Sequence, residues 1–190
     1  FDTVDDCLGD PNNSATLLNI WHGSGIKRLS FVFRLNTLRG AGVNHFLFEK
    51  ASSGPGTNIQ GWRLTANVGG ALQFVQETSD ALNFDWTLAG AVASGSLVVG
   101  SMQWDGDVTS AANVKVRLYD STTGQFTLRS PVISTQVGKV IGSDAGRAFL
   151  VGNNATFDSE WIGPACAFWF TNPAPQDYLL DDAIMSEWIA

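Results

Sequence analysis

Hydrophobic and polar side chains alternate along most of this 190-residue chain, and this period of two constrains the fold more than any other feature. In the two clearest segments, residues 30–35 and 113–119, every second side chain is apolar. Such alternation is typical of β-strands with one buried face. Seven further segments rich in β-branched or aromatic residues are bounded by turn-forming residues: 16–21, 43–50, 62–67, 71–77, 97–104, 148–152 and 165–171.

Tight turns connect several of these expected strands. Residues 67–70 (NVGG) lie between two of them and Asp105-Gly106 follows a third, and glycine supplies the positive φ that a hairpin turn needs. One short helix is expected over residues 182–188, with Asp181 as its N-cap. Many strands separated by turns favour an all-β fold, a two-sheet antiparallel β-sandwich or jelly roll with one C-terminal helix.

Charge and hydropathy exclude two classes of partner. The net charge is −7 and the 11 basic residues are scattered, whereas nucleic-acid binding depends on clustered Lys and Arg. Apolar runs stay well below the ~18 residues needed to cross a bilayer, so no membrane insertion is expected. We expect a single domain over residues 1–190. Because the chain begins at Phe1, we also expect it to be a segment of a longer or processed chain.

Several motifs, taken in order, resemble LamG-like, concanavalin A-like lectin and glucanase jelly rolls. Each motif is short, but together they cover nearly the whole chain. They are FDTVDDCL at the start, the hairpin FLFEKASSGPGTNIQGWRLTANVGGALQFV, the corner VVGSMQWDGD, the strand and turn NVKVRLYDSTTGQ, the final strands FLVGNNATFDSEWIGPACAFWF and the helix LLDDAIMSEW. The sequence departs from the family pattern at Thr3, at Cys7 and in an insertion at 82–93.

The resemblance implies that the opening strand lies beside the closing strands, which would bring Cys7 and Cys166 near each other. The residues alone leave open whether these cysteines form a disulfide or remain two buried thiols. The resemblance also implies a recognition or assembly fold rather than one particular activity, because this sandwich carries lectins, adhesion modules, glycanases and virion proteins.

Enzymatic chemistry finds little support in the residues. Retaining glycoside hydrolysis needs two carboxylates about 5 Å apart, which alternate positions on one strand supply most easily, and none of the four glutamates is followed by a carboxylate two residues later. Glu77 and Asp80 come nearest, but their spacing puts them on opposite faces. The two histidines, His22 and His45, are expected to face solvent. We therefore predict no catalytic residues, and keep glycoside hydrolase as the third alternative.

Tryptophan is abundant, and an exposed indole beside amide and carboxylate groups suits carbohydrate binding. Five tryptophans fit core or sheet positions: Trp21, Trp62, Trp104, Trp161 and Trp169. Trp86 differs, because it lies in the insertion beside Asn83 and Asp85. We therefore predict a glycan-binding loop at these three residues. A second candidate is the loop that carries Asn153, Asn154 and Asp158.

The leading hypothesis is a non-catalytic module for carbohydrate binding or adhesion on an extracellular or virion surface, with glycans as partners. The alternative is a structural assembly domain of a virus particle, held by neighbouring protein subunits, for which residues 89–100 would expose apolar side chains. The Asp105-Gly106-Asp107 corner is expected to be a hairpin turn with Trp104 packed inward. Calcium is the only cofactor considered, because Asp and Asn side chains in edge loops are the ligands it prefers.

The inner faces of the two sheets are expected to be filled by seven apolar side chains: Phe31, Phe33, Phe46, Phe48, Val114, Val116 and Leu118. Packing of this kind consumes the faces between the sheets. Any ligand would then be bound by rim loops or by an outer sheet face.

Overall fold

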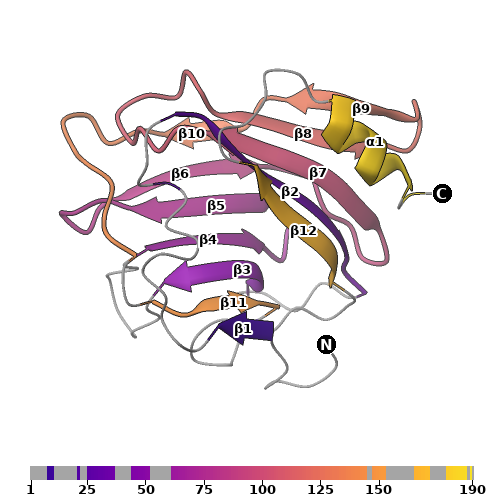
Figure 1. Cartoon of the computed structure of the whole chain (residues 1–190), viewed down its shortest axis with the longest axis horizontal. Helices are drawn as coiled ribbons and strands as arrows, with labels where there is room; N and C mark the ends of the chain where they lie inside the picture. The colour runs from indigo at the N-terminus through magenta and orange to yellow at the C-terminus, as the bar shows by residue number, and fades with distance from the viewer. Residues whose placement is uncertain are drawn as a thin grey trace.

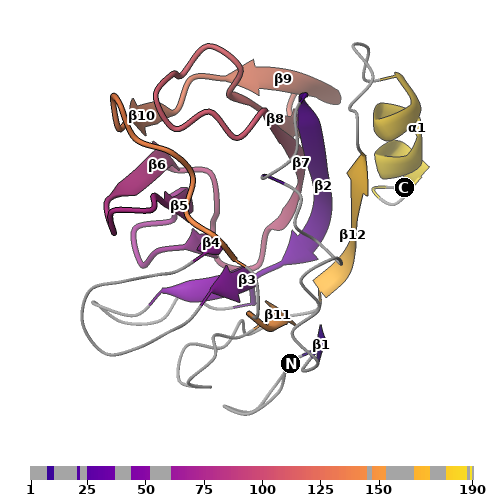
Figure 2. The same cartoon turned by 60° about the vertical axis from the view of Figure 1, so that its left-hand side comes forward.

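Two antiparallel sheets pack face to face, as the alternation predicts (Figure 1). The computed structural model describes residues 8–10, 21, 25–36, 44–51, 61–144, 147–152, 165–171, 179–187 and 189. Figure 2 shows the larger sheet curving around one side of the molecule, with the smaller sheet and the helix on the other. The fold is a jelly-roll β-sandwich with one short C-terminal helix, so the predicted fold class is confirmed.

The larger sheet has seven strands in the order β1-β11-β3-β4-β5-β6-β10. Their bounds are β1 Leu8–Asp10, β3 His45–Ala51, β4 Gly61–Ala66, β5 Leu72–Glu77, β6 Asn83–Leu88, β10 Val132–Ser134 and β11 Phe149–Val151. The hairpin between β4 and β5 uses the predicted turn at residues 67–70, where Gly70 has a φ of 73°. The insertion at 82–93 contains strand β6, Asn83–Leu88, and is not a loop as expected.

The smaller sheet has five strands in the order β12-β2-β7-β8-β9. Their bounds are β2 Lys27–Arg34, β7 Leu97–Trp104, β8 Lys115–Asp120, β9 Gln125–Arg129 and β12 Ala165–Thr171. The strands β2 and β7 are the longest that the structure describes, and they pair over their whole length, from Lys27 opposite Trp104 to Arg34 opposite Leu97. Together with β8 they form the middle of this sheet.

A dense aromatic core fills the space between the sheets. Trp104 stacks on Phe84 with ring centroids 4.6 Å apart, and it also lies against Trp21, at 5.6 Å. Six of the seven predicted inner-face residues belong to this core or pack against it: Phe31, Phe33, Phe48, Val114, Val116 and Leu118. The predictions that Trp21, Trp62 and Trp104 are core residues are confirmed, because each is at most 1% exposed.

Phe46 is the inner-face prediction that is wrong. The register between β3 and β4 shifts between Phe46 and Phe48, so Leu47 is an extra residue in β3. A bulge of this kind changes which face the preceding residues occupy. Phe46 is consequently opposite Thr65 on the outer face of the seven-stranded sheet, where the guanidinium of Arg63 lies 5.6 Å from the centroid of its ring.

The opening and closing parts of the chain meet at one sheet edge, as the resemblance implied. β1 pairs antiparallel with β11, with Leu8 opposite Val151 and Asp10 opposite Phe149. Cys7 lies outside the described residues, and for Cys166 the structure describes only the backbone, within β12. Their proximity and their disulfide bond stay predictions.

Helix α1, Leu179–Glu187, packs on the outer face of the five-stranded sheet. Met185 is fully buried there against Val32 and Val99. Asp182 accepts two hydrogen bonds from the Arg117 guanidinium, at 2.8 and 2.9 Å. The predicted start of the helix was wrong: the helix begins at Leu179 rather than at Asp182, so Asp181 lies inside its first turn and is not the N-cap, whereas its end at Glu187 is one residue from the predicted end.

The surface distribution of apolar side chains differs from the sequence prediction. Residues 89–100 were expected to expose them, but Val92, Val98 and Val99 are each at most 5% exposed, because they pack into the two cores. The large apolar side chains that are exposed lie elsewhere: Leu82, Leu128, Val132, Val137 and Val140. Within the described residues, no helix has the length and apolar character needed to cross a bilayer.

Candidate functional site

The predicted binding loop at Trp86 does not exist in the form expected. Trp86 lies in the middle of β6, is 0% exposed and stacks on Phe74, with centroids 6.1 Å apart. Asn83 and Asp85 point to the opposite face of the strand, because side chains alternate. The indole therefore offers no exposed surface to a sugar. The prediction of an exposed stacking residue was wrong because the alternation that buries Phe84 and Trp86 continues through the insertion.

The remaining predicted site residues have different outcomes. Asn153, Asn154 and Asp158 lie outside the described residues, so the second predicted loop stays a prediction. His22 is outside them too. His45 was expected to face solvent, and this is wrong: it is 0% exposed, because the bulge in β3 turns it inward opposite Ala66.

The acidic corner after β7 is a turn held by its own side chains. Gly106 has a φ of 85°, and Trp104 is 0% exposed and donates its indole N–H to the Asp107 carbonyl at 3.3 Å. Asp105 accepts from the Asp107 backbone N–H at 3.0 Å and from the Asn113 amide. The Asp107 carboxylate accepts from the backbone and hydroxyl of Thr109, at 2.8 and 2.7 Å. The predicted turn with Trp104 packed inward is confirmed, but β8 begins only at Lys115, so residues 105–114 form a longer connection than the tight hairpin that was expected.

Calcium at this corner stays a hypothesis. The carboxylate oxygens of Asp105 and Asp107 are already used as acceptors by local donors, which a cation would have to displace. Elsewhere in the described part of the chain, no three acidic, histidine or cysteine side chains gather closely enough to hold a metal ion.

A different group of polar residues lies on the outer face of the seven-stranded sheet. We call it the polar face, and it consists of Arg63 and Thr65 on β4, Glu77 on β5, Asp85 on β6, and Arg147, whose charge acts on Glu77. Their strand neighbours Trp62, Leu64, Phe74, Phe84 and Trp86 point into the core. Alternation along β4, β5 and β6 therefore gathers the polar side chains on one surface.

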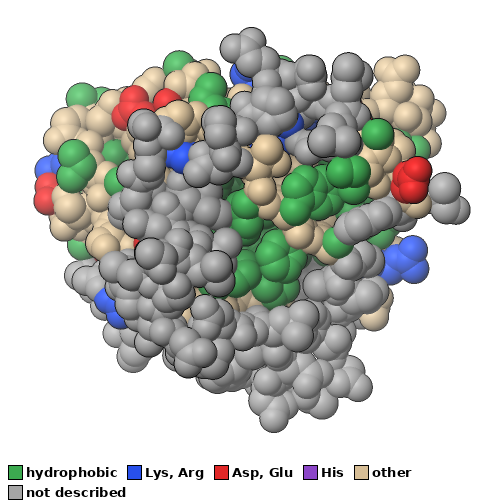
Figure 3. All heavy atoms as spheres, in the orientation of Figure 1, with side chains coloured by type: hydrophobic (Ala, Val, Ile, Leu, Met, Phe, Trp, Pro, Cys, Tyr) green, Lys and Arg blue, Asp and Glu red, His purple; other side chains and the backbone are tan. Residues whose placement is uncertain are grey.

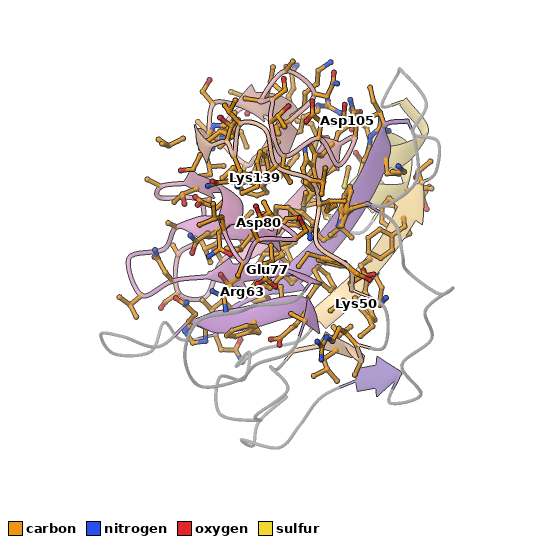
Figure 4. The ribbon with its side chains drawn as sticks, turned by 90° about the vertical axis from the view of Figure 1, so that its left-hand side faces the viewer. Lys50, Arg63, Glu77, Asp80, Asp105 and Lys139 are labelled. Carbon is orange, nitrogen blue, oxygen red and sulfur yellow. The ribbon has the colours of Figure 1, made fainter. Side chains whose placement is uncertain are left out.

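The strand register places Glu49, Arg63 and Asp85 in one row across the sheet, with Val75 between Arg63 and Asp85. Glu49 of β3 is opposite Arg63, Arg63 is opposite Val75, and Val75 is opposite Asp85. Because neighbouring strands are about 4.8 Å apart, Arg63 and Asp85 are separated by about 10 Å. Figure 4, which looks toward the strand ends, shows Lys139, Asp80, Glu77 and Arg63 one below another along this side of the molecule.

Burial leaves several atoms of the polar face without hydrogen-bond partners. Thr65 is 1% exposed and Glu77 is 2% exposed. No described group hydrogen-bonds to Arg63 Nε, Thr65 Oγ1, Glu77 Oε2 or Arg147 Nε. A buried polar atom with no partner costs about 1–3 kcal/mol. These atoms include donors and acceptors, so a ligand with hydroxyl groups would recover free energy by bonding to both kinds.

The ionisable side chains of the polar face are shifted toward their neutral forms. Burial raises the pKa of the Glu77 carboxyl, and the nearby Arg147 only partly offsets this. Burial also raises the pKa of Asp85. Burial lowers the pKa of the Arg63 guanidinium, against the opposing effect of Glu49. In each case desolvation is the larger cause, so hydrogen bonds made at this face act in a medium of reduced dielectric.

The polar face becomes more exposed toward β6. Glu49 at the β3 side is 1% exposed, whereas Arg63, Asp85 and Thr87 are half-buried and Asn83 is exposed. A ligand would therefore approach from the β6 side and reach the deeper atoms of Thr65 and Glu77 last. The predicted residues Asn83 and Asp85 belong to this open part, although not beside an exposed indole.

The sequence analysis singled out only part of this face. Glu77 was considered with Asp80 and set aside, and the structure agrees: Asp80 lies in the turn after β5 and pairs with Lys139 at 2.6 Å. Arg63 and Thr65 were not considered. The signal was present, because in WRLTA the polar residues occupy every second position of a strand whose other face is apolar.

Comparisons with known proteins identify the fold. No family model and no curated protein matches the chain. Among solved structures, the CBM40 of the Ruminococcus gnavus IT-sialidase bound to α2,3-sialyllactose has a TM-score of 0.56 at 10% identity, covering 86% of this chain and 83% of that one. The receptor-binding domain of botulinum neurotoxin mosaic serotype C/D has a TM-score of 0.54 at 10% identity, over 87% of this chain.

The chain spans 37% of the length of that toxin domain. Sequence identity at this level carries no information on ligands, because one sandwich fold hosts many unrelated sites. The chain thus shares the jelly-roll sandwich fold of these two proteins.

Proposed function

We propose that this domain is a non-catalytic recognition module that binds carbohydrate at the polar face. The observation that carries the proposal is the set of buried atoms without partners at Arg63, Thr65, Glu77 and Arg147. Sugar hydroxyls donate and accept hydrogen bonds at once, so one ring can serve a guanidinium donor and a carboxylate acceptor together. The sialidase CBM40 with its bound sialyllactose gives a precedent for glycan binding on a sandwich of this fold.

The charges of the polar face favour a neutral glycan. Two carboxyl side chains of the polar face, Glu77 and Asp85, and the neighbouring Glu49 of β3 lie on this surface with two guanidinium groups, Arg63 and Arg147. An acidic sugar would have to approach an excess of carboxylates in a poorly hydrated setting, which raises the cost of like charge. A neutral, hydroxyl-rich sugar meets no such repulsion, so we propose that it is preferred over sialylated ligands.

Glycoside hydrolysis is the second function that a specific observation brings into view. Glu77 and Asp85 are diagonal neighbours on adjacent strands, a relation that places side chains about 7–8 Å apart, within the range of inverting glycosidases. Inverting chemistry needs one protonated and one ionised carboxyl, whereas burial shifts the pKa of both groups in the same direction. We therefore propose binding without turnover.

The LamG-like family relation, which rests on the order of the sequence motifs, and a location on an extracellular or virion surface are parts of the same proposal. Both fit a module that meets glycans outside a cell.

A glycan array followed by calorimetry on the best ligand tests the proposal. Arg63→Gln and Thr65→Val should each weaken binding about tenfold or more, since each removes a hydrogen bond made in a buried setting. Lys115→Gln is the matched control, because Lys115 is exposed on β8 of the other sheet, and it should leave the affinity unchanged. Binding that ignores both polar-face variants, or no glycan binding at all, would refute the site.

A reducing-sugar assay on the bound glycan separates binding from hydrolysis. We expect no release of sugar by the purified chain. Release that disappears in Glu77→Gln would replace the proposed function with a hydrolase.

A further inference from the structure

Strand β9 is an edge of the five-stranded sheet with little protection. It pairs with β8 on one side, and no strand in the described part of the chain pairs with its other side. Figures 1 and 2 both show β9 at the outer margin of the molecule. Its apolar residue Leu128 is 65% exposed. An edge that no described strand pairs with, and that exposes an apolar side chain, is a surface on which another strand can add.

The apolar side chains of β9 lie on the same side as helix α1. Phe126 packs against the cluster around Met185 and contacts Tyr119, with ring centroids 5.5 Å apart. Leu128 is two residues further along the strand, so its side chain points to the same face. Figure 3 shows apolar side chains in the middle of the view, where β12 lies in Figure 1. Leu128 lies on the outer face of β9 beside Phe126, opposite Arg117 of β8.

We propose that β9 pairs antiparallel with β9 of a second copy of this chain, with Thr127 on the two-fold axis. In this register Phe126 of one copy is directly opposite Leu128 of the other, and Gln125 is opposite Arg129. A register shifted by one residue would place Phe126 opposite Thr127 and join the outer face of one sheet to the inner face of the next. Only a register centred on a residue keeps the two outer faces continuous.

Charges at the ends of β9 suit this pairing. Gln125 is opposite Asp120 of β8 in the same chain, so across the axis Arg129, Gln125 and Asp120 would form one row on one face. The cation and the carboxylate then belong to different copies, and no like charges are directly opposite one another. The two-fold repeats the same row at the other end of the strand, as an isologous interface requires.

This inference is independent of the proposed glycan site. Its first test is sedimentation equilibrium over a range of concentrations. We expect a reversible dimer whose dissociation constant rises at least about tenfold in Leu128→Lys, because the lysine would be buried against Phe126 of the partner. The matched control is Val137→Lys: Val137 is 81% exposed but lies outside β9, so that variant should dimerise as the parent does.

Engineered cysteines test the register itself. Residues opposite each other in an antiparallel pair have Cα atoms about 4.5–5.5 Å apart, within reach of a disulfide. Thr127→Cys should cross-link with itself, whereas Phe126→Cys and Leu128→Cys should cross-link only when the two variants are mixed. Peptide mapping distinguishes these bonds from any made by Cys7 or Cys166.

Two results would overturn the inference. One is a chain that stays monomeric throughout the concentration range. The other is a dimer that forms equally well in Leu128→Lys and in which Thr127→Cys does not cross-link. Circular dichroism of each variant confirms that it is folded before its oligomeric state is compared.

Discussion

The indole of Trp86 stacks on the ring of Phe74 with an interplanar angle of 18°. Both side chains are 0% exposed, and Ile133 of β10 is opposite Trp86 and packs against the same core. The contact thus joins β5 to β6 and secures the edge of the larger sheet. Trp86 is a structural residue, and its indole N–H finds no hydrogen-bond partner in the described part of the chain.

Replacing Trp86 with alanine should destabilise the fold by about 3 kcal/mol or more, because it leaves a cavity beside Phe74. Denaturant unfolding measures this free energy. Leu82→Ala is the control, since Leu82 is 45% exposed in the preceding turn and its truncation should cost much less. Selective loss of glycan affinity with unchanged stability in Trp86→Ala would contradict the structural role.

Glu77 should make stability depend on pH in a defined direction. Burial raises the pKa of its carboxyl in the folded state, so the folded chain binds this proton more tightly than the unfolded chain. The resulting stabilisation is complete below the unfolded value of about 4.3 and is lost as the pH rises through the folded pKa. Glu77→Gln, which imitates the neutral acid, should therefore raise the melting temperature more at about pH 8 than at about pH 5.

Scanning calorimetry of the parent and the Glu77→Gln variant at both pH values gives this difference directly. Glu187→Gln is the control for loss of a carboxylate, because Glu187 is exposed on α1. An identical gain for Glu77→Gln at both pH values would show that desolvation of the carboxylate has no effect on stability.

Gly106 should tolerate no side chain. A Cβ there would lie 2.2 Å from the Trp21 carbonyl oxygen, and the φ of 85° disfavours every other residue. Gly106→Ala should cost well over 1 kcal/mol, about 1 of it from the backbone alone. Gly90→Ala is a close control: Gly90 also has a positive φ, 64°, but a Cβ would meet nothing within 4 Å. Equal unfolding free energies for the two variants would show that the contact with Trp21 is unimportant.

Helix α1 should depend on one buried side chain. Met185→Ala removes a fully buried contact with Val32 and Val99, and should cost about 2–5 kcal/mol. Asp182→Asn weakens only the half-buried pair with Arg117 and should cost about 1 kcal/mol. Limited proteolysis that releases the helix readily from Met185→Ala, and slowly from Asp182→Asn, would match this order. The reverse order would show that the ion pair between Asp182 and Arg117 holds the helix to the sheet more strongly than Met185 does.

Calcium should have no effect on the corner after β7. The carboxylates of Asp105 and Asp107 already accept hydrogen bonds from Asn113 and Thr109. We expect the melting temperature to be the same in excess calcium and in a chelator, as measured by differential scanning fluorimetry. A clear rise of the melting temperature with calcium would show that this corner is a metal site.

The sequence predicted the sheets well because alternation is a local signal. The pattern at Phe31 and Phe33, and again at Val116 and Leu118, fixed both the strands and their buried faces. It failed at Phe46, because a bulge is an exception to alternation that the residues HFLFEKA do not reveal. It also missed β6, where the family pattern suggested a loop although Phe84 and Trp86 kept the period of a strand.

The candidate site was harder to predict, because its residues come together only through strand register. Arg63, Glu77 and Asp85 are separated along the chain, and each is an ordinary polar residue at an outward strand position. Nothing in the sequence tells that burial would leave Thr65 and Glu77 almost inaccessible. The abundant tryptophan favoured a binding site at Trp86 instead, but Trp62 and Trp86 are both packed in the core.

The extra residue Leu47 interrupts the alternation of side chains along β3, so the residues before and after it do not follow one continuous inward–outward pattern. Deleting Leu47 would restore regular pairing without moving Phe46, because Phe48 would stay opposite Leu64 and Phe46 would stay opposite Thr65. The interior would lose only the side chain of Leu47, which is 2% exposed and belongs to the core. The bulge therefore lets β3 place two consecutive side chains, Leu47 and Phe48, in the core while Phe46 keeps its position against Arg63 on the surface.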